Sequence, residues 1–280
     1  MRSGTSFASV RNALSHFGDT ITFRKEIFSQ TISVKQDYKS VLLLGYYRNA
    51  LAHIFYQEAF CVCALNGFGE RLAFTDGIAK ERLYEETLFL GSLFQGEYVT
   101  RTPLLTLKDT EKVANQLLAR GVLESHGPNL RLAKGKETNV AFLCSLVWPL
   151  VDTFWTTTTF AFGLKHRQAV PMEKLMHGVQ MFAENLYEER VISFYESCAL
   201  ESIKHSVNTL ATLRIFEKVT AGEIKMMKLT EDLNKDEARL QELLDHIGTF
   251  KKAGFAKSLS SPDELRKSLM SDYAMTSPKL

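Results

Sequence analysis

Long apolar or amphipathic stretches, separated by short turn signals, occupy most of the chain and predict helices. The first stretch covers residues 41–65, and a second covers residues 78–94. A third helix is expected over residues 106–120, because Gly121 follows it and glycine commonly ends helices. This half of the chain is therefore predicted to be mainly helical.

The second half continues the helical pattern. A long apolar helix is expected from Asn139 onward, with a kink near Pro149. Pro171 favours a helix start, since proline is common at the first helical position. One or two helices are expected over residues 188–213, and a charged amphipathic helix over residues 234–250.

Two short segments carry the signals of β-hairpins instead. Residues 122–132 alternate apolar and polar side chains on either side of the turn sequence His126-Gly-Pro-Asn129. Residues 215–229 do the same around Ala221-Gly222. The predicted fold class is therefore mainly α, a multi-helix bundle with two small β-hairpins.

The same patterns divide the chain into three parts. Residues 1–40 form an N-terminal segment that is only partly helical, with a short helix over residues 6–18 and a polar stretch behind it. Residues 41–250 form the helical domain, and residues 251–280 form a polar tail. No internal repeat or low-complexity linker interrupts this order.

Composition indicates a folded protein with a sizeable core, since 45% of the residues are hydrophobic and 24% are charged. The 34 basic and 32 acidic residues give a formal net charge of +2, which makes nucleic acid an unfavoured partner. The spacing of the cysteines fits neither a zinc site nor a disulfide framework. Reduced thiols in the core are expected at all of them: Cys61, Cys63, Cys144 and Cys198.

Two apolar segments are long enough to reach across a membrane. Residues 41–65 contain Arg48 and Glu58, and residues 140–164 contain Asp152. Charges in the middle of a bilayer are costly and rare, so we expect buried or interfacial helices that do not span a membrane. The N-terminus lacks the apolar region of a secretory signal.

No catalytic site follows from the residues alone. Among the histidines, only His53 is followed by an acid five positions later, at Glu58. Five positions along a helix turn two side chains about 140° apart, so this pair is interpreted as a weak catalytic decoy. The chain has no nucleophile elbow, phosphate-binding loop or metal-ligand pattern. We therefore predict no catalytic residue and no metal site.

Several segments, taken in order, resemble a known family. Residues 46–55 (YYRNALAHIF) are followed by the apolar segment 86–98 and by the helix and hairpin of residues 113–131. Residues 142–164 then include Leu146-Val-Trp-Pro-Leu-Val-Asp152. Over residues 40–250 this order is similar to the C-terminal region of the glycerol-3-phosphate and dihydroxyacetone-phosphate acyltransferases.

The resemblance implies an activity that belongs to a larger assembly. Family members transfer an acyl group from acyl-CoA to the 1-hydroxyl in phospholipid biosynthesis, with acyl-CoA as co-substrate and no cofactor. Their catalytic motif, a histidine followed five positions later by an aspartate, lies upstream of this region and does not occur in the chain. The region alone is therefore expected to be inactive. The alternative reading is a non-enzymatic protein-interaction scaffold.

The resemblance also implies partners and a location. The expected partners are an acyltransferase catalytic domain, in cis or in trans, and a membrane surface. The mitochondrial outer membrane is the expected location, with the peroxisome as alternative. The end Pro278-Lys279-Leu280 is a degraded form of the Ser-Lys-Leu import signal. A fragment and a stand-alone protein both remain open.

One structural hypothesis concerns two charges in apolar surroundings. Arg48 lies among tyrosines and aliphatic residues, and Asp152 lies between Val151 and aromatic side chains. A buried guanidinium needs acceptors. We predict that Arg48 pairs with Asp152, or otherwise with Glu97 or Glu196.

Overall fold

The computed structural model describes residues 4–25, 30–35, 37–98, 103–221 and 224–252. The chain divides into two compact units, Met1–Leu51 and Ala52–Leu280. We call them the N-terminal unit and the main unit and describe each by itself. The described residues are mainly helical with small antiparallel sheets, which confirms the predicted fold class.

The described residues of the N-terminal unit form two helices and a hairpin. Its elements are α1 (Gly4–Ser15), a short 3₁₀ turn (Gly18–Thr20), β1 (Ile21–Lys25), β2 (Gln30–Val34) and α2 (Tyr38–Ala52). Two aromatic side chains, Phe17 and Tyr47, meet edge to face with their ring centroids 5.4 Å apart. The carboxylate of Asp37 accepts hydrogen bonds from the backbone N–H and the hydroxyl of Ser40, which caps the start of α2.

The β1–β2 hairpin corrects the prediction of a merely polar stretch after residue 18. Phe23 lies opposite Ile32, and Ile21 lies opposite Val34. Side chains alternate across a strand, so these four residues share one apolar face. The alternation is visible in the sequence but extends over only a few residues on each strand. Short runs of this kind are easily read as loop.

The predicted helix over residues 41–65 is wrong as a single element. The structure has α2 ending at Ala52 and α3 (Tyr56–Gly67) beginning after three intervening residues. In the turn between them, the N–H of Phe55 donates to the carbonyl of Ala52 over 2.9 Å. No glycine or proline lies between these helices, so the sequence carries no local signal for the break.

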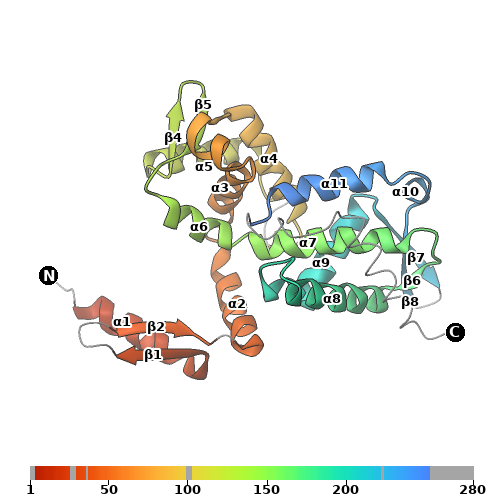
Figure 1. The fold of residues 1–280 in the computed structure, drawn as a ribbon, viewed down its shortest axis with the longest axis horizontal. Helices are drawn as coiled ribbons and strands as arrows, with labels where there is room; N and C mark the ends of the chain where they lie inside the picture. Colours follow the sequence, from red (N-terminus) through yellow and green to blue (C-terminus); the bar gives the residue numbers. More distant parts are fainter. Residues whose placement is uncertain (1–3, 26–29, 36, 99–102, 222–223, 253–280) are drawn as a thin grey trace. The chain divides into compact units, whose positions relative to one another are not determined.

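The first half of the main unit is built around α3, whose residues 59–65 are all buried. The helices α4 (Lys80–Leu93), α5 (Leu107–Ala119) and α6 (Glu137–Ser145) pack against it (Figure 1). The predicted hairpin is confirmed as β4 (Leu123–His126) and β5 (Asn129–Leu132), and β3 (Ile78–Ala79) adds a third strand in the order β3-β5-β4. A π-helical turn, Leu72–Asp76, precedes β3.

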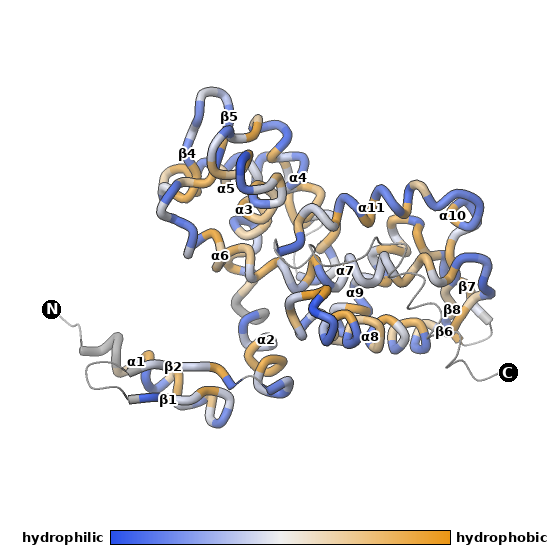
Figure 2. Tube along the Cα trace, in the orientation of Figure 1, coloured by the Kyte–Doolittle hydropathy of each residue, from blue (hydrophilic) through white to orange (hydrophobic). Residues whose placement is uncertain are grey.

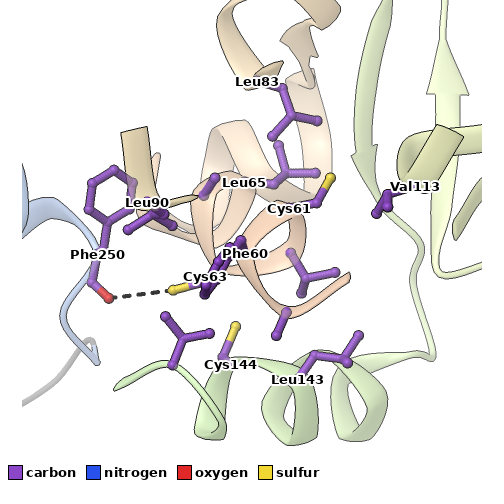
Figure 3. Close-up of a cluster of buried hydrophobic side chains, with 14 of the residues drawn as sticks. Phe60, Cys61, Cys63, Leu65, Leu83, Leu90, Val113, Leu143, Cys144 and Phe250 are labelled. Atoms are coloured by element: carbon purple, nitrogen blue, oxygen red, sulfur yellow. Dashed lines mark hydrogen bonds between the residues drawn. The ribbon is translucent and has the colours of Figure 1, made fainter. Parts of the chain in front are cut away.

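Figure 3 shows the core that α3 organises. Cys61, Cys63 and Cys144 lie among leucine and phenylalanine side chains, and all four cysteines of the chain are buried and free of disulfides, as predicted. The thiol of Cys63 approaches the carbonyl oxygen of Phe250, with 3.8 Å between sulfur and oxygen. Residues from both ends of the main unit therefore share this core.

The second half of the main unit is arranged along α7 (Trp148–Ala161). Figure 1 shows α8 (Met172–Glu188) on one side of α7 and α11 (Ala238–Thr249) on the other. α9 (Leu200–Thr212) also packs against α7. The second predicted hairpin is confirmed as β7 (Phe216–Ala221) and β8 (Ile224–Leu229), which β6 (Val170–Pro171) extends in the order β6-β8-β7. Three short helical elements complete this half: Phe162–Leu164, Tyr195–Cys198 and α10 (Glu231–Lys235).

Threonines make α7 a buried helix that is nevertheless polar. Thr153, Thr157 and Thr158 are almost fully buried, and their hydroxyls donate to carbonyls one turn back in the helix. Thr157 also shares a hydrogen bond of 2.7 Å with Ser206 of α9. In Figure 2 the outer elements, such as α10 and β4, are mainly hydrophilic. These three threonines therefore enter the interior with their hydrogen bonds made, as buried hydroxyls require, whereas the buried hydroxyl of Thr156 has no partner among the described residues.

Candidate functional site

The decoy pair His53 and Glu58 lies where α2 gives way to α3. His53 is exposed in the turn between α2 and α3, and Glu58 lies in the first turn of α3. The Nη1 atom of Arg120, at the end of α5, donates to both carboxylate oxygens of Glu58 over 2.7 and 2.9 Å. Glu58 therefore joins α3 to α5, and this charge pair gives it a structural role.

Asp152 is the centre of the most buried charged cluster described in the main unit. Only 2% of the residue is exposed. Its Oδ2 atom accepts a hydrogen bond of 2.9 Å from the backbone N–H of Ser193, and its Oδ1 atom lies 3.7 Å from Nζ of Lys251. The partner identified in the main unit is thus a lysine near the end of α11. The predicted pairing with Arg48, which lies in the other unit, stays a prediction.

Lys251 is held by more than the carboxylate. Its Nζ atom donates to the carbonyl of Val191 over 3.2 Å and lies 3.6 Å from the centre of the Trp155 ring. The neighbouring Lys252 lies near two stacked aromatic rings, with 5.7 Å to Trp148 and 5.6 Å to Phe194. Cation–π contacts of this kind add to the ion pair and fix the chain after α11 against α7.

Burial changes the proton affinity of both partners. Burial raises the pKa of Asp152, and the nearby Lys251 ammonium opposes that rise. Burial also lowers the pKa of Lys251, and the Asp152 carboxylate opposes that fall. Each charge therefore stabilises the other where water cannot. Protein covers both groups almost completely, so they are suited to holding α7 and α11 together and not to meeting a substrate.

A second acid with a buried carboxylate oxygen, Glu97, lies in the turn after α4. The Oε1 atom of Glu97 is buried and has no hydrogen-bond partner among the described residues. Burial raises the pKa of Glu97 to about 8, and the charge of Glu201 on α9 adds to the effect. Nearby, His205 pairs with Glu201 over 3.2 Å, and its ring packs against Gly96. The sequence offered no signal for this cluster, because it joins the turn after α4 to α9, far apart in the chain.

Neither a metal centre nor a single membrane-spanning helix is present in the described ranges. No group of three or more potential metal-ligating side chains comes together there. No single described helix is long and apolar enough to cross a membrane. The two consecutive helical stretches Glu137–Ser145 and Trp148–Leu164 meet these criteria only as a pair, bent by 48° at their junction.

Comparison with known families shows which family the chain belongs to. The family model described as the glycerol-3-phosphate acyltransferase C-terminal region matches residues 3–219. That range includes most of the N-terminal unit and the main unit as far as β7. The chain belongs to this family. No curated protein matches the chain in sequence.

The range matched by the model of this acyltransferase C-terminal region differs at both ends from the range of the sequence resemblance, which covered residues 40–250. The family match begins at residue 3, so α1 and the β1–β2 hairpin are family elements. It ends at residue 219, before α10 and α11. Lys251 therefore lies beyond the matched range, whereas its partner Asp152 lies within it.

Proposed function

We propose that this chain is the accessory helical region of a glycerol-3-phosphate, or dihydroxyacetone-phosphate, 1-O-acyltransferase and is inactive alone. The family match over residues 3–219 is the observation that supports this proposal. The catalytic domain, in cis or in trans, supplies the base and the oxyanion donors that transfer of an acyl group from acyl-CoA requires.

The surroundings of Glu58 support an accessory role for this chain, with the catalytic residues on another domain. A base for the acceptor hydroxyl needs a carboxylate that orients it. Glu58 engages Arg120, and only 14% of its side chain is exposed. The buried Asp152–Lys251 pair likewise serves to hold helices together. The acid–base pairs of the main unit that we describe thus stabilise a scaffold.

The N-terminal unit offers a surface for the catalytic domain. Phe23, Ile32 and Val34 share the apolar face of the β1–β2 hairpin and are 45%, 46% and 41% exposed. Tyr46 of α2 is 72% exposed. Clustered exposed apolar residues mark interaction surfaces. In our proposal, the catalytic domain covers the apolar face of this hairpin.

Activity measurements on the purified chain test the proposal. Alone, the chain should not transfer radiolabelled acyl groups from acyl-CoA to glycerol 3-phosphate or dihydroxyacetone phosphate. Adding a separately purified catalytic domain from a family member should raise the activity or stability of that domain. Turnover by the chain alone that His53→Ala abolishes would refute the proposal.

A matched pair of variants tests the docking face. Phe23→Glu places a charge on the apolar face of the hairpin and should abolish binding to the catalytic domain. Arg24→Glu places the same charge on the opposite face of the same strand and should leave binding intact. Equal loss in both variants would mean that the hairpin face is not the contact. A complex with unrelated proteins and no catalytic domain would favour the scaffold alternative.

Location is part of the same proposal. We place the protein peripherally on the mitochondrial outer membrane, with the peroxisome as the alternative. The degraded import signal Pro278-Lys279-Leu280 lies outside the described residues. Fractionation followed by carbonate extraction tests both points, since a peripheral protein is released by carbonate. Retention in the carbonate pellet would contradict peripheral association.

A further inference from the structure

A groove of about 790 Å³ lies in the main unit between the start of α8, the middle of α9 and the β7–β8 hairpin. Its apolar lining is rich in methionine, with Met172, Met176 and Met227 alongside Val219. Met227 is fully buried, whereas Ile224 is 57% exposed. The half-buried Met172 and Met176 therefore form the accessible apolar floor of the groove, with Met227 behind them and Ile224 at its mouth.

Four lysines line the same groove: Lys174, Lys204, Lys218 and Lys225. Lys204 lies 3.4 Å from Glu201, and Lys218 donates to the Oδ1 atom of Asn208 over 3.0 Å. Lys174 and Lys225 form no ion pair with any described carboxylate. Glu173 is the only acidic residue among the described lining residues. The groove thus combines an apolar floor with an excess of positive charge.

We propose that this groove binds a single-chain anionic amphiphile. The alkyl or acyl chain lies along the methionine floor, and the anionic headgroup lies among the lysines. The volume falls within the range of about 300–1,000 Å³ that is typical of small-molecule sites. Methionine side chains are flexible and polarisable, so they adapt to a chain that can bend.

The shape favours a single molecule over the surface of a bilayer. Met172 and Met176 are half-buried in the groove, and the fully buried Met227 lies behind them. A flat bilayer cannot reach half-buried side chains in a groove, whereas one flexible chain can enter it. Removing a chain from water supplies the driving force, and the lysines select the charge of the headgroup.

Calorimetry with the full chain, purified without detergent, tests the site. Dodecyl phosphate, kept below its micelle concentration, should bind with one molecule per chain. Decyl phosphate has two fewer methylenes and should bind about tenfold more weakly, given the free energy of burying each methylene. Dodecylphosphocholine has the same chain without net charge and should bind more weakly than dodecyl phosphate. Inorganic phosphate alone should not bind measurably.

Two kinds of variant separate the headgroup from the chain. Lys174→Glu combined with Lys225→Glu should weaken dodecyl phosphate about tenfold and leave dodecylphosphocholine unchanged. Val219→Trp fills the groove and should weaken both ligands. Met176→Gln makes the floor polar and should do the same if the tryptophan variant does not fold. Thermal unfolding shows which variants remain folded.

A control for general charge effects uses lysines on another helix. Lys108→Glu combined with Lys112→Glu makes the same charge change on the exposed surface of α5, away from the groove. This variant should bind dodecyl phosphate within about twofold of the unmodified chain. An equal loss in both double variants would overturn the proposal, because attraction would then depend only on net charge.

Two other occupants would also overturn it. Binding to phosphatidylglycerol vesicles without binding to monomeric dodecyl phosphate would identify a membrane-docking face instead. A stable dimer that Lys174→Glu and Lys225→Glu dissociate, again without dodecyl phosphate binding, would identify an interface between copies. Light scattering on the same samples measures this second outcome.

Discussion

The two units of the molecule place their apolar side chains in different ways. In the main unit, Phe60, Phe94 and Phe154 are fully buried, and residues 59–65 form a continuous buried run. In the N-terminal unit, Phe23 and Ile32 lie opposite each other on the hairpin and remain nearly half exposed. Similar residue types thus form a closed core in one unit and a surface in the other.

The two units therefore differ in how far burial of apolar area stabilises each of them. Burial of apolar area is the main favourable contribution to folding, and the main unit buries enough of it to close its core. A two-stranded hairpin with an exposed apolar face is marginally stable on its own. The catalytic domain that we propose as partner would therefore stabilise the hairpin of the N-terminal unit most, whereas the main unit closes its own core.

The largest expected effect tests the comparison directly. Phe60→Ala removes a fully buried ring from the main unit and should lower the free energy of unfolding by about 3–5 kcal/mol. Phe23→Ala in the N-terminal unit, where the ring is 45% exposed, should change it by about 0.5 kcal/mol or less. Urea denaturation of both variants measures the contrast. Similar losses would mean that the hairpin face is buried in the folded protein.

A buried charge should matter almost as much as a buried ring. Asp152→Ala leaves the ammonium of Lys251 buried without its carboxylate and should cost about 3–5 kcal/mol. Glu85→Ala, at an exposed position on α4, should change stability by less than about 0.5 kcal/mol. Adding Lys251→Met to Asp152→Ala should restore part of the loss. Failure of that rescue would show that the pair does not act as a unit.

The same measurement examines the pairing predicted between Arg48 and Asp152. A double-mutant cycle with Arg48→Ala and Asp152→Ala gives the coupling energy of the two side chains. If the pair forms, the two single losses should not add. Additive losses would leave Lys251 as the effective partner of Asp152.

A smaller effect depends on pH. Burial raises the pKa of Glu97 from its ordinary value of 4.5 to about 8. Between these values the folded state holds a proton that the unfolded state has released, so stability should fall as pH rises through this window. Glu97→Gln should remove that slope and raise the free energy of unfolding above pH 8 by about 1–3 kcal/mol. Glu85→Gln is the matched control, and an unchanged slope in Glu97→Gln would argue against the burial of this acid.

The smallest effect concerns the contact between α3 and α5. Arg120→Ala removes the partner of Glu58 and should cost about 0.2–1 kcal/mol, because the arginine side chain is 58% exposed. His53→Ala should leave stability unchanged within about 0.5 kcal/mol. Thermal unfolding of the two variants compares them. A larger loss for His53→Ala would show that this histidine supports the fold.

Local patterns were sufficient for most of the secondary structure. Thr106 and Asp109 form a capping box at the start of α5, and Gly121 follows its end with a positive φ of 66°. The turn at residues 126–129 joins β4 to β5 as its sequence predicts. Each of these features depends on residues that are close together in the chain, so it can be predicted from the sequence. The hairpin at Ile21 and Phe23 was missed because its alternating runs are short.

Only the tertiary structure determined which side chains pair with the buried charged residues. Asp152 has an evident need for a partner in the sequence, yet nothing local points to Lys251 or to the N–H of Ser193. The same holds for Glu58 with Arg120, and for the lysines that α8, α9 and the β7–β8 hairpin bring to one groove. Sequence periodicity states which face of a helix is apolar. Which helix packs against that face depends on how all the helices pack together. That packing brings Asp152 to Lys251 and Glu58 to Arg120.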